Sequence, residues 1–193
     1  MTEVNQSYLW EKSYPDDLDW RAPLAPHALP ALIENAAKKY ASRPAIDFMD
    51  RIYSFAELAE LVNRAATGLQ TQGIGKGDRV GLMLPNCPAM VISYFAVLTA
   101  GGTVVNFNPL YAEEEIRVQI EDSECDILIT LDMPLIYDKA AKMLGETRLK
   151  KIVLAAMTEQ LQFPKSLLYK LLRRKSIVTM PADSRHISFK NLT

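Results

Sequence analysis

The chain has 193 residues, of which 49% are hydrophobic and 23% are charged, and its formal net charge is −1. This length and composition are typical of one folded α/β domain, or of part of a larger one, and they exclude a disordered chain. The balanced charge gives no general attraction for nucleic acid, so we expect no nucleic-acid partner.

Residues 1–26 are predicted to form an N-terminal arm, because they are rich in proline, aspartate and aromatic residues and show no periodic pattern. The aromatic side chains would anchor the arm on a surface of the domain. The segment lacks a cationic start followed by an apolar block, so it does not resemble a secretory signal. Residues 27–193 are predicted to form one α/β unit. The aromatic residues of the arm are Tyr8, Trp10, Tyr14 and Trp20.

The α/β unit begins with a helical pattern over residues 29–40, and two short extended runs over residues 45–53 then indicate a hairpin. Ser54 and Glu57 have the S-x-x-E spacing of a capping box. They predict the start of a helix that ends at Gly73.

Short apolar runs then alternate with helical patterns along the chain. Such alternation predicts βαβ units, and therefore an α/β fold in which a largely parallel sheet is flanked by helices. The predicted strands cover residues 78–84, 103–105, 125–129 and 151–154, and the helices between them begin at the cap Asn86, near Ala112 and near Ile136.

One apolar stretch, residues 89–107, could be mistaken for a membrane span. Gly101 and Gly102 interrupt it, and the helical part before them would rise only about 18 Å, against a bilayer core of about 30 Å. We therefore predict a buried helix followed by a buried strand.

Three features of the sequence suggest chemistry but have simpler structural explanations. The glycine-rich segment 73–77 follows a helix and precedes a strand, the reverse of the order in a phosphate-binding loop, and so predicts a turn. Glu113, Glu114 and Glu115 point in different directions on a helix and suit the positive end of its dipole. His27 and His186, the latter in a predicted polar loop, are expected to be surface residues.

The two cysteines, Cys87 and Cys125, have no C-x-x-C spacing and no neighbouring histidine. We expect buried, reduced thiols in a cytoplasmic protein, and neither a disulfide nor a metal site.

Asn106, Asn108 and Tyr111 follow the second predicted strand of the parallel sheet. Ligands of α/β folds bind beyond the carboxyl ends of strands, so these residues are candidates to line a pocket. The alternative is a turn in which the asparagines satisfy backbone groups.

Residues 164–175 form a predicted amphipathic helix with five positive charges and no negative charge. Two interpretations remain open. In one, the helix docks its leucines on the domain. In the other, it lies in the interface of an anionic membrane, and its contacts are Leu168, Lys170, Leu171 and Arg173.

Several motifs, taken together, resemble those of one enzyme family. Tyr53–Leu58 (YSFAEL) resembles the first core motif of the adenylate-forming, or AMP-binding, enzymes, and Leu98–Asn106 (LTAGGTVVN) resembles the second. Lys76–Val80 and Leu84–Asn86 lie between them at the spacing of that family. Each motif is weak alone, but their order along the chain is specific.

The resemblance is most detailed for one branch of the family. Asn108–Tyr111 and Gln119–Ser123 are similar to the corresponding segments of bacterial long-chain acyl-CoA synthetases, and the similarity extends from Leu29 to Leu154. It implies an enzyme that joins a fatty acid to coenzyme A, using ATP and Mg²⁺ and releasing AMP and pyrophosphate.

The resemblance also implies that essential parts of that enzyme have no counterpart in residues 1–193. These parts are the phosphate-binding loop, the ribose-binding aspartate and a C-terminal lysine. The chain therefore resembles the N-terminal α/β subdomain of the AMP-binding domain, truncated before the phosphate-binding loop. We assign it no catalytic, cofactor-binding or metal-ligating residue, and we expect it to be inactive alone.

The implied partners are the rest of the parent enzyme, the fatty acid, and a second copy in a homodimer, with peripheral contact at the inner face of the membrane. Two alternatives to the truncated ligase remain. One is a naturally short, non-catalytic interaction module, and the other is a fragment of another acyl- or aryl-adenylating enzyme. The stop within Ile187–Leu192, in mid-element, favours truncation.

Overall fold

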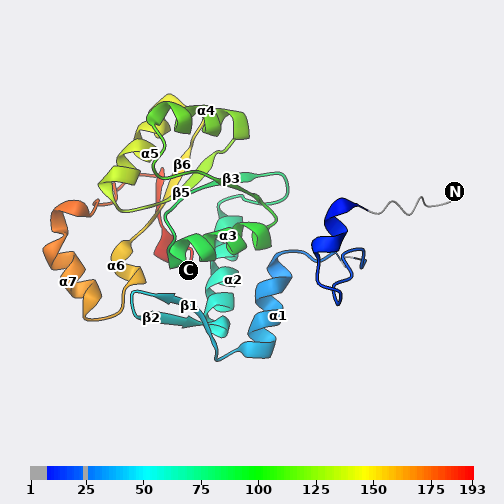
Figure 1. Cartoon of the computed structure of the whole chain (residues 1–193). Helices are drawn as coiled ribbons and strands as arrows, with labels where there is room; N and C mark the ends of the chain where they lie inside the picture. Colours follow the sequence, from blue (N-terminus) through cyan, green and yellow to red (C-terminus); the bar gives the residue numbers. More distant parts are fainter. Residues whose placement is uncertain (1–7, 24–25) are drawn as a thin grey trace.

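A parallel β-sheet forms the centre of the protein in the computed structural model, which describes residues 8–23 and 26–193 (Figure 1). Within these residues the sheet has five strands in the order β4-β3-β5-β6-β7, and every neighbouring pair is parallel. The predicted α/β fold is therefore confirmed. The strands are β3 (Arg79–Met83), β4 (Thr103–Asn106), β5 (Ile127–Leu131), β6 (Lys151–Ala155) and β7 (His186–Ser188).

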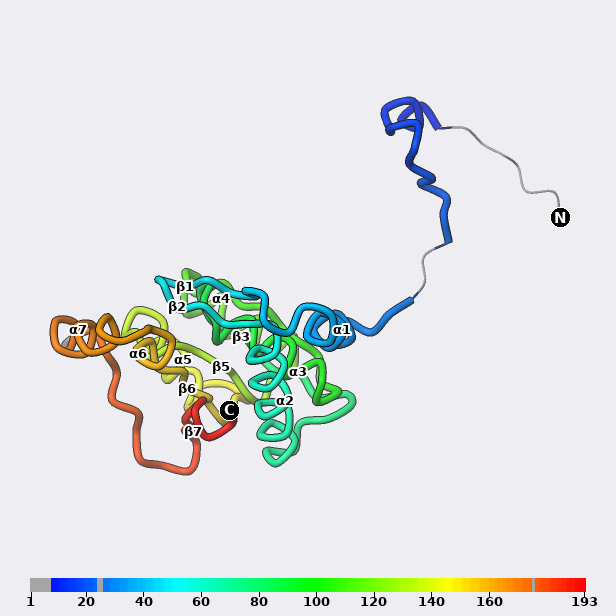
Figure 2. The backbone as a smooth tube through the Cα atoms, turned by 90° about the horizontal axis from the view of Figure 1, so that it is seen from below, coloured from blue at the N-terminus to red at the C-terminus, as the bar shows by residue number. Residues whose placement is uncertain are grey.

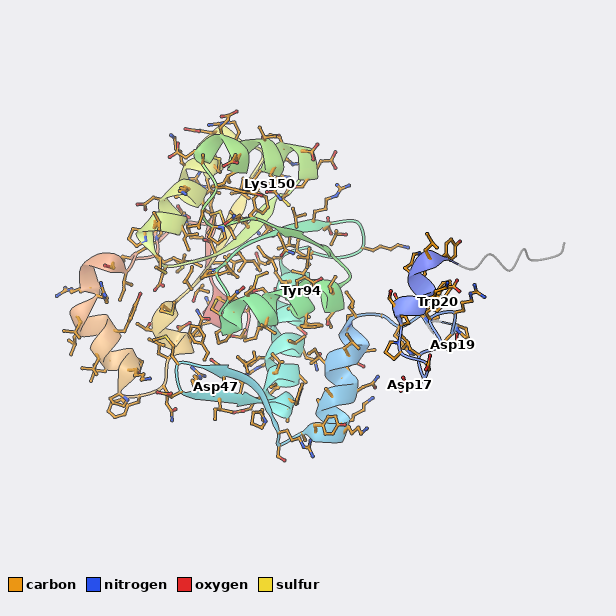
Figure 3. The ribbon with its side chains drawn as sticks, viewed as in Figure 1. Asp17, Asp19, Trp20, Asp47, Tyr94 and Lys150 are labelled. Atoms are coloured by element: carbon orange, nitrogen blue, oxygen red, sulfur yellow. The ribbon has the colours of Figure 1, made fainter. Side chains whose placement is uncertain are left out.

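An antiparallel hairpin precedes the sheet and consists of β1 (Pro44–Phe48) and β2 (Arg51–Ser54). Met49 and Asp50 have φ angles of 51° and 71°, the left-handed conformation that a two-residue hairpin turn requires. The hairpin expected in this region is confirmed, and Asp47 of β1 marks its position in Figure 3.

Helices cover both faces of the sheet. The helices α2 and α3 pack against one face, and α4 and α5 pack against the other (Figures 1 and 2). The α-helices are α1 (Pro30–Tyr40), α2 (Phe55–Thr71), α3 (Pro88–Ala100), α4 (Glu113–Ser123), α5 (Pro134–Glu146), α6 (Met157–Gln160) and α7 (Lys165–Leu172), and the short 3₁₀ helices are η1 (Leu9–Ser13), η2 (Arg174–Ser176) and η3 (Phe189–Asn191).

The ends of two helices show how local sequence directs the fold. The capping box at α2 is confirmed: the Ser54 hydroxyl accepts from the Glu57 amide at 3.2 Å, and the Glu57 carboxylate accepts from the Ser54 amide at 2.8 Å. Losing such a cap costs about 1 kcal/mol. The N-cap of α3 is Cys87 and not Asn86, and Gly101, at φ 93°, ends this helix.

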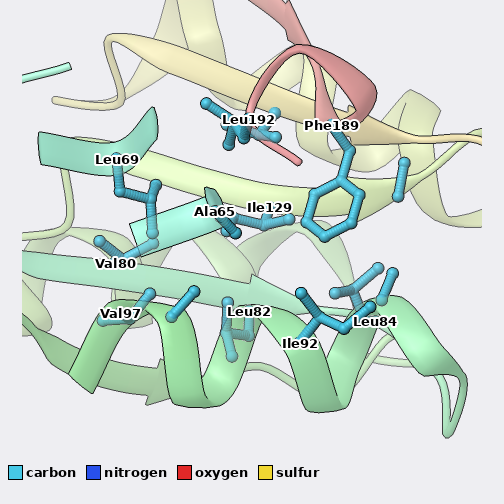
Figure 4. Close-up of a cluster of buried hydrophobic side chains, with 14 of the residues drawn as sticks. Ala65, Leu69, Val80, Leu82, Leu84, Ile92, Val97, Ile129, Phe189 and Leu192 are labelled. Carbon is cyan, nitrogen blue, oxygen red and sulfur yellow. The ribbon is translucent and has the colours of Figure 1, made fainter. Parts of the chain in front are cut away.

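Alternate residues of each strand build two separate cores. Leu128 of β5 faces the helices α4 and α5, whereas Ile129 faces α2 and α3. Phe189 and Leu192, from the C-terminal η3 turn, close the second of these cores together with Leu69 of α2 (Figure 4). Complete burial of a leucine or isoleucine side chain contributes about 1.5–3 kcal/mol to the free energy of unfolding. The two cores therefore account for much of the stability of the protein.

The described part of the N-terminal arm packs on itself. The Tyr8 ring stacks on Trp10 at 5.1 Å between centroids, and Trp10 contacts Trp20 edge to face at 4.7 Å. Residues 8–23 lie apart from the helices and the sheet in every view (Figures 1–3). We had expected the aromatic residues to anchor the arm on the domain. They contact one another instead, so that expectation is wrong. The remaining residues of the predicted arm, 1–7 and 24–25, lie outside the described residues.

Candidate functional site

The strand order places a topological switch point between β3 and β5. The chain leaves β3 for α3 on one face of the sheet, and it leaves β5 for α5 on the opposite face. The connecting segments diverge at this point, and the crevice beyond the carboxyl ends of such strands is where α/β folds bind ligands. Residues that contact a ligand are therefore expected in the segments that follow β3, β5 and β6.

A buried carboxylate, Asp132, lies directly after β5. Its side chain accepts a hydrogen bond from the Met157 amide at 2.8 Å, and its own amide donates to the Ala155 carbonyl at 2.9 Å. Burial raises the pKa of Asp132, although the hydrogen bond from Met157 opposes the shift. Asp132 therefore fixes the start of α6 against the end of β5. Asp132 was not among the predicted site residues, because its only signal in the sequence is a polar residue directly after an apolar strand.

An apolar pocket of about 280 Å³ opens at the same edge of the sheet, beside the end of β6. The first turn of α3, the α6 helix and the η3 turn enclose it. We call it the carboxyl-edge pocket. Its main apolar residues are Tyr53, Leu61, Ala89, Ile92, Ala155 and Phe189, and its polar residues include Arg51, Glu159, Gln160 and Lys190.

Several polar groups of the carboxyl-edge pocket serve the protein's own backbone. The buried Gln160 side chain accepts from the Ala89 amide at 2.9 Å, which satisfies an amide at the N-terminus of α3. The Arg51 guanidinium donates to the Glu159 carbonyl and lies 4.5 Å from the centroid of the Tyr53 ring. The pocket therefore offers apolar walls and a fixed backbone, an arrangement suited to burying an apolar group.

The candidates Asn106, Asn108 and Tyr111 lie further along the sheet, at the end of the edge strand β4 and in the segment that follows it. Asn106 ends β4, and its carbonyl accepts from Gln119 at 2.9 Å. The Asn108 side chain accepts from the Leu110 amide at 3.0 Å, which is the turn role considered as the alternative. Tyr111 lines a shallow surface hollow beside α4. The structure does not bring these residues into the carboxyl-edge pocket, and their contact with a ligand stays a prediction.

The glycine-rich turn between α2 and β3 lies at the opposite, amino edge of the sheet. Its amides are used within the chain: the Gly73 amide donates to the Gln70 carbonyl at 2.9 Å, and the Gly75 amide donates to the Asp78 carboxylate at 2.8 Å. This arrangement is a helix-terminating turn, as the order of elements predicted.

The three consecutive glutamates at the start of α4 have three separate partners. Glu113 pairs with Lys142, Glu114 pairs with Arg117, and Glu115 accepts from the Ala112 amide at 2.8 Å. They do not converge on one ion. Among the described residues, we find no group of three or more histidine, cysteine, aspartate or glutamate side chains suited to a metal.

The prediction that His186 lies in a loop at the surface is wrong. It is the first residue of β7, and its side chain is only 4% exposed. Its Nδ1 lies 2.7 Å from the Asp183 carboxylate and its Nε2 lies 2.9 Å from the Tyr137 hydroxyl. This chain of contacts joins α5 to the edge strand of the sheet. His27, in contrast, is exposed as expected.

The basic helix is confirmed as α7, but its leucines do not dock on the domain. Leu168 and Leu171 are 50% and 66% exposed, and Lys170 and Arg173 are exposed as well. The interpretation in which the helix docks its leucines on the domain is therefore wrong for Leu168 and Leu171. Within the described part of the chain, no helix combines the length and the apolar character needed to cross a membrane.

Comparisons with known proteins point to one family. Residues 33–185 match the sequence model of a family described as AMP-binding enzyme. The long-chain-fatty-acid–CoA ligase of Bacillus subtilis (strain 168) is 38% identical over 168 residues, covering 87% of this chain and 30% of the ligase. The corresponding ligase of Yersinia pestis is 37% identical over 165 residues, covering 83% of this chain and 28% of the ligase.

A solved structure agrees with these relatives. The long-chain-fatty-acid–CoA ligase from Archaeoglobus fulgidus aligns with a TM-score of 0.60 at 26% identity, over 66% of this chain and 27% of that chain. The present chain thus spans about 30% of the length of the curated relatives it matches.

Proposed function

The chain belongs to the AMP-binding enzyme family, and we propose that it supplies the N-terminal part of a long-chain fatty-acid CoA ligase. Such an enzyme converts a fatty acid, ATP and coenzyme A to acyl-CoA, AMP and pyrophosphate. The observation that carries this proposal is the sequence identity with the Bacillus subtilis ligase along most of the chain.

The proposed role of these 193 residues is to support the reaction without performing it. Adenylation places negative charge on transferring phosphates, and cations and free amide donors must stabilise that charge. The glycine-rich turn does not fit a nucleotide phosphate, because its Gly73 and Gly75 amides are already bonded within the chain. ATP, Mg²⁺ and coenzyme A would therefore be held by the remainder of the parent enzyme.

The carboxyl-edge pocket is the proposed contact with that remainder. It is apolar, it lies where α/β folds bind ligands, and Gln160 holds its backbone in place. An apolar segment of the parent enzyme seated there would brace the site in which the fatty acid binds.

A homodimer is the second proposed association. An apolar pocket that stays open to solvent favours association of copies. Light scattering of the 193-residue chain at rising concentration should therefore show a species larger than a monomer. A monomer at every concentration would contradict this proposal.

The cytoplasm is the proposed location, with peripheral contact at the inner face of the membrane. Cys87 and Cys125 are both free and buried, and burial raises the pKa of each thiol. Unreactive reduced thiols are typical of cytoplasmic proteins.

The supporting role can be tested with the purified chain. The chain is incubated with ATP, Mg²⁺, palmitate and hydroxylamine, and pyrophosphate and acyl-hydroxamate are measured beside the Bacillus subtilis ligase as a positive control. We expect no product above the level measured without protein. Cooperative unfolding of the same sample on heating establishes that the chain is folded. Product formed by the chain alone would overturn the proposed role.

A further inference from the structure

The outer side of α7 is an unusually apolar surface for a short helix. The five side chains of this surface, which we call the leucine face, are all exposed; four belong to α7, and Phe163 directly precedes Pro164, the N-cap of the helix. The five are Phe163 at 75%, Leu167 at 48%, Leu168 at 50%, Leu171 at 66% and Leu172 at 79%. In both views α7 lies at the periphery of the molecule, away from the sheet (Figures 1 and 2).

The opposite side of α7 is attached to the protein, which fixes the leucine face outward. Ser166 and Tyr169 lie on that side and are partly buried. Lys165 at the start of the helix pairs with Asp50 and donates to the Met49 carbonyl in the hairpin turn. The exposure of the leucines is therefore a consequence of how the helix docks.

The charged side chains of the segment that carries the leucine face are all positive. No acidic residue occurs in the sequence between Glu159 and Asp183. Lys170 is exposed on the flank of α7 next to the leucine face, and Arg173 and Arg174 are exposed at the C-terminal end of the helix. Lysine and arginine at the borders of an apolar helical surface extend their charges toward lipid head groups while their stems stay in apolar contact.

From this arrangement we propose that α7 binds the surface of an anionic lipid bilayer and buries its leucine face in the interface. An amphipathic helix with a cationic border binds in this way, through apolar burial and through attraction to anionic lipid. A second copy of the chain is a poorer occupant, because a two-fold contact between leucine faces would bring together two segments that each carry only positive charges. The benefit of such binding, access to a lipid-borne fatty acid, rests on the proposed function, whereas the binding itself does not.

The test is flotation of the purified 193-residue chain with vesicles of phosphatidylcholine containing phosphatidylglycerol, beside vesicles of phosphatidylcholine alone. Four proteins are compared. They are the wild type, the charge variant Lys170→Glu/Arg173→Glu, the apolar variant Leu168→Asn/Leu171→Asn, and the control Lys38→Glu/Lys39→Glu, which makes the same charge change on exposed residues of α1. Far-UV circular dichroism and thermal unfolding establish that all four are folded.

We expect the wild type and the α1 control to float with the anionic vesicles at low salt, and to float less at high salt. Removing two cations from a protein bound to an anionic surface should lower its partitioning onto the vesicles about thirtyfold. The charge variant replaces both cations with glutamate, so its partitioning should fall at least as much. The apolar variant should lose at least about tenfold. No flotation of the wild type, or equal flotation of all four proteins, would overturn the proposal.

Two further outcomes would also overturn it. In the first, the leucine face joins copies of the chain: the wild type sediments as a dimer, the apolar variant sediments as a monomer, and neither floats. In the second, the remainder of the parent enzyme covers this face: a chimera of this chain with the rest of the Bacillus subtilis ligase is active but does not float. Because activity is assayed separately with dispersed palmitate, failure of flotation is distinguishable from failure of the proposed function.

Discussion

The side-chain oxygen of Gln160 lies 2.9 Å from the backbone nitrogen of Ala89, and both residues are buried although 71 positions separate them in the sequence. This hydrogen bond joins α6 to the first turn of α3 in the wall of the carboxyl-edge pocket. It satisfies an amide that the helix itself cannot satisfy. One side chain thus connects the two helices that form the wall of the candidate site.

Replacing Gln160 with leucine should destabilise the protein by about 1–3 kcal/mol, because the buried Ala89 amide loses its acceptor. The matched control is Gln162→Leu, at an exposed position two residues further on, where we expect a change within about 0.5 kcal/mol. Urea denaturation followed by circular dichroism measures both. Equal stability of the two variants would contradict the structural role of Gln160.

Gly81 of β3 should not tolerate a side chain. An added Cβ would lie 2.4 Å from Leu128 Cδ1 and 2.9 Å from Phe107 Cε2, within the core on the α4–α5 face. Overpacking of this kind costs about 1–3 kcal/mol, so Gly81→Ala should lower the free energy of unfolding by that amount.

The control for this prediction is Gly145→Ala in α5, where an added Cβ meets nothing within 4 Å. Alanine in a helix is more favourable than glycine by about 0.5–1 kcal/mol, so this variant should be more stable than the wild type. Destabilisation of both variants to the same degree would show that the close packing at Gly81 is not the cause.

The sequence predicted the fold well wherever local signals agreed with one another. The capping box of Ser54 and Glu57, the glycine at position 101 and the alternation of apolar runs each specify an element through its own residues. The assignment of His186 was wrong because β7 is only three residues long, and its place in the sheet depends on pairing with β6. A contact between Tyr137 and His186 has no local signal.

Asp132 makes the stability depend on pH. Burial raises its pKa above the ordinary value of about 3.9, so its charged form is disfavoured in the folded state. The favourable contribution is present below the unfolded-state pKa and is lost as the pH rises through the folded-state pKa.

The variant Asp132→Asn keeps an oxygen that can accept from the Met157 amide but carries no charge. Its stability relative to the wild type should therefore increase as the pH is raised from about 3.5 to 7, measured by urea denaturation at each pH. A difference that stays constant, or that decreases over this range, would contradict the buried position of this carboxylate.

The two tryptophans of the chain, Trp10 and Trp20, both lie in the arm. Because the arm packs on itself, apart from the sheet (Figure 3), it should lose its structure at a lower urea concentration than the domain. Tryptophan fluorescence should then change before the far-UV circular dichroism signal does. Coincident transitions of the two signals would instead indicate one cooperative unit.

The candidate site was less predictable than the fold, for physical reasons. Asn106, Asn108 and Tyr111 follow a strand, but the sequence does not reveal that this strand, β4, lies at the edge of the sheet. The switch point between β3 and β5, and with it Asp132, becomes visible only once the strand order is known. The leucines of α7 have the same pattern whether they face the domain or the solvent.

The central claim is that these 193 residues serve as the N-terminal part of a long-chain fatty-acid CoA ligase. Its most direct test is a chimera in which this chain replaces the matching segment of the Bacillus subtilis ligase, assayed for acyl-CoA formation from palmitate, ATP and coenzyme A. A second chimera carrying Ile92→Asp in the carboxyl-edge pocket tests the contact proposed there. We predict ATP-dependent acyl-CoA formation by the first chimera and at least a tenfold lower rate for the second. A first chimera that folds, binds ATP and forms no acyl-CoA would contradict the claim.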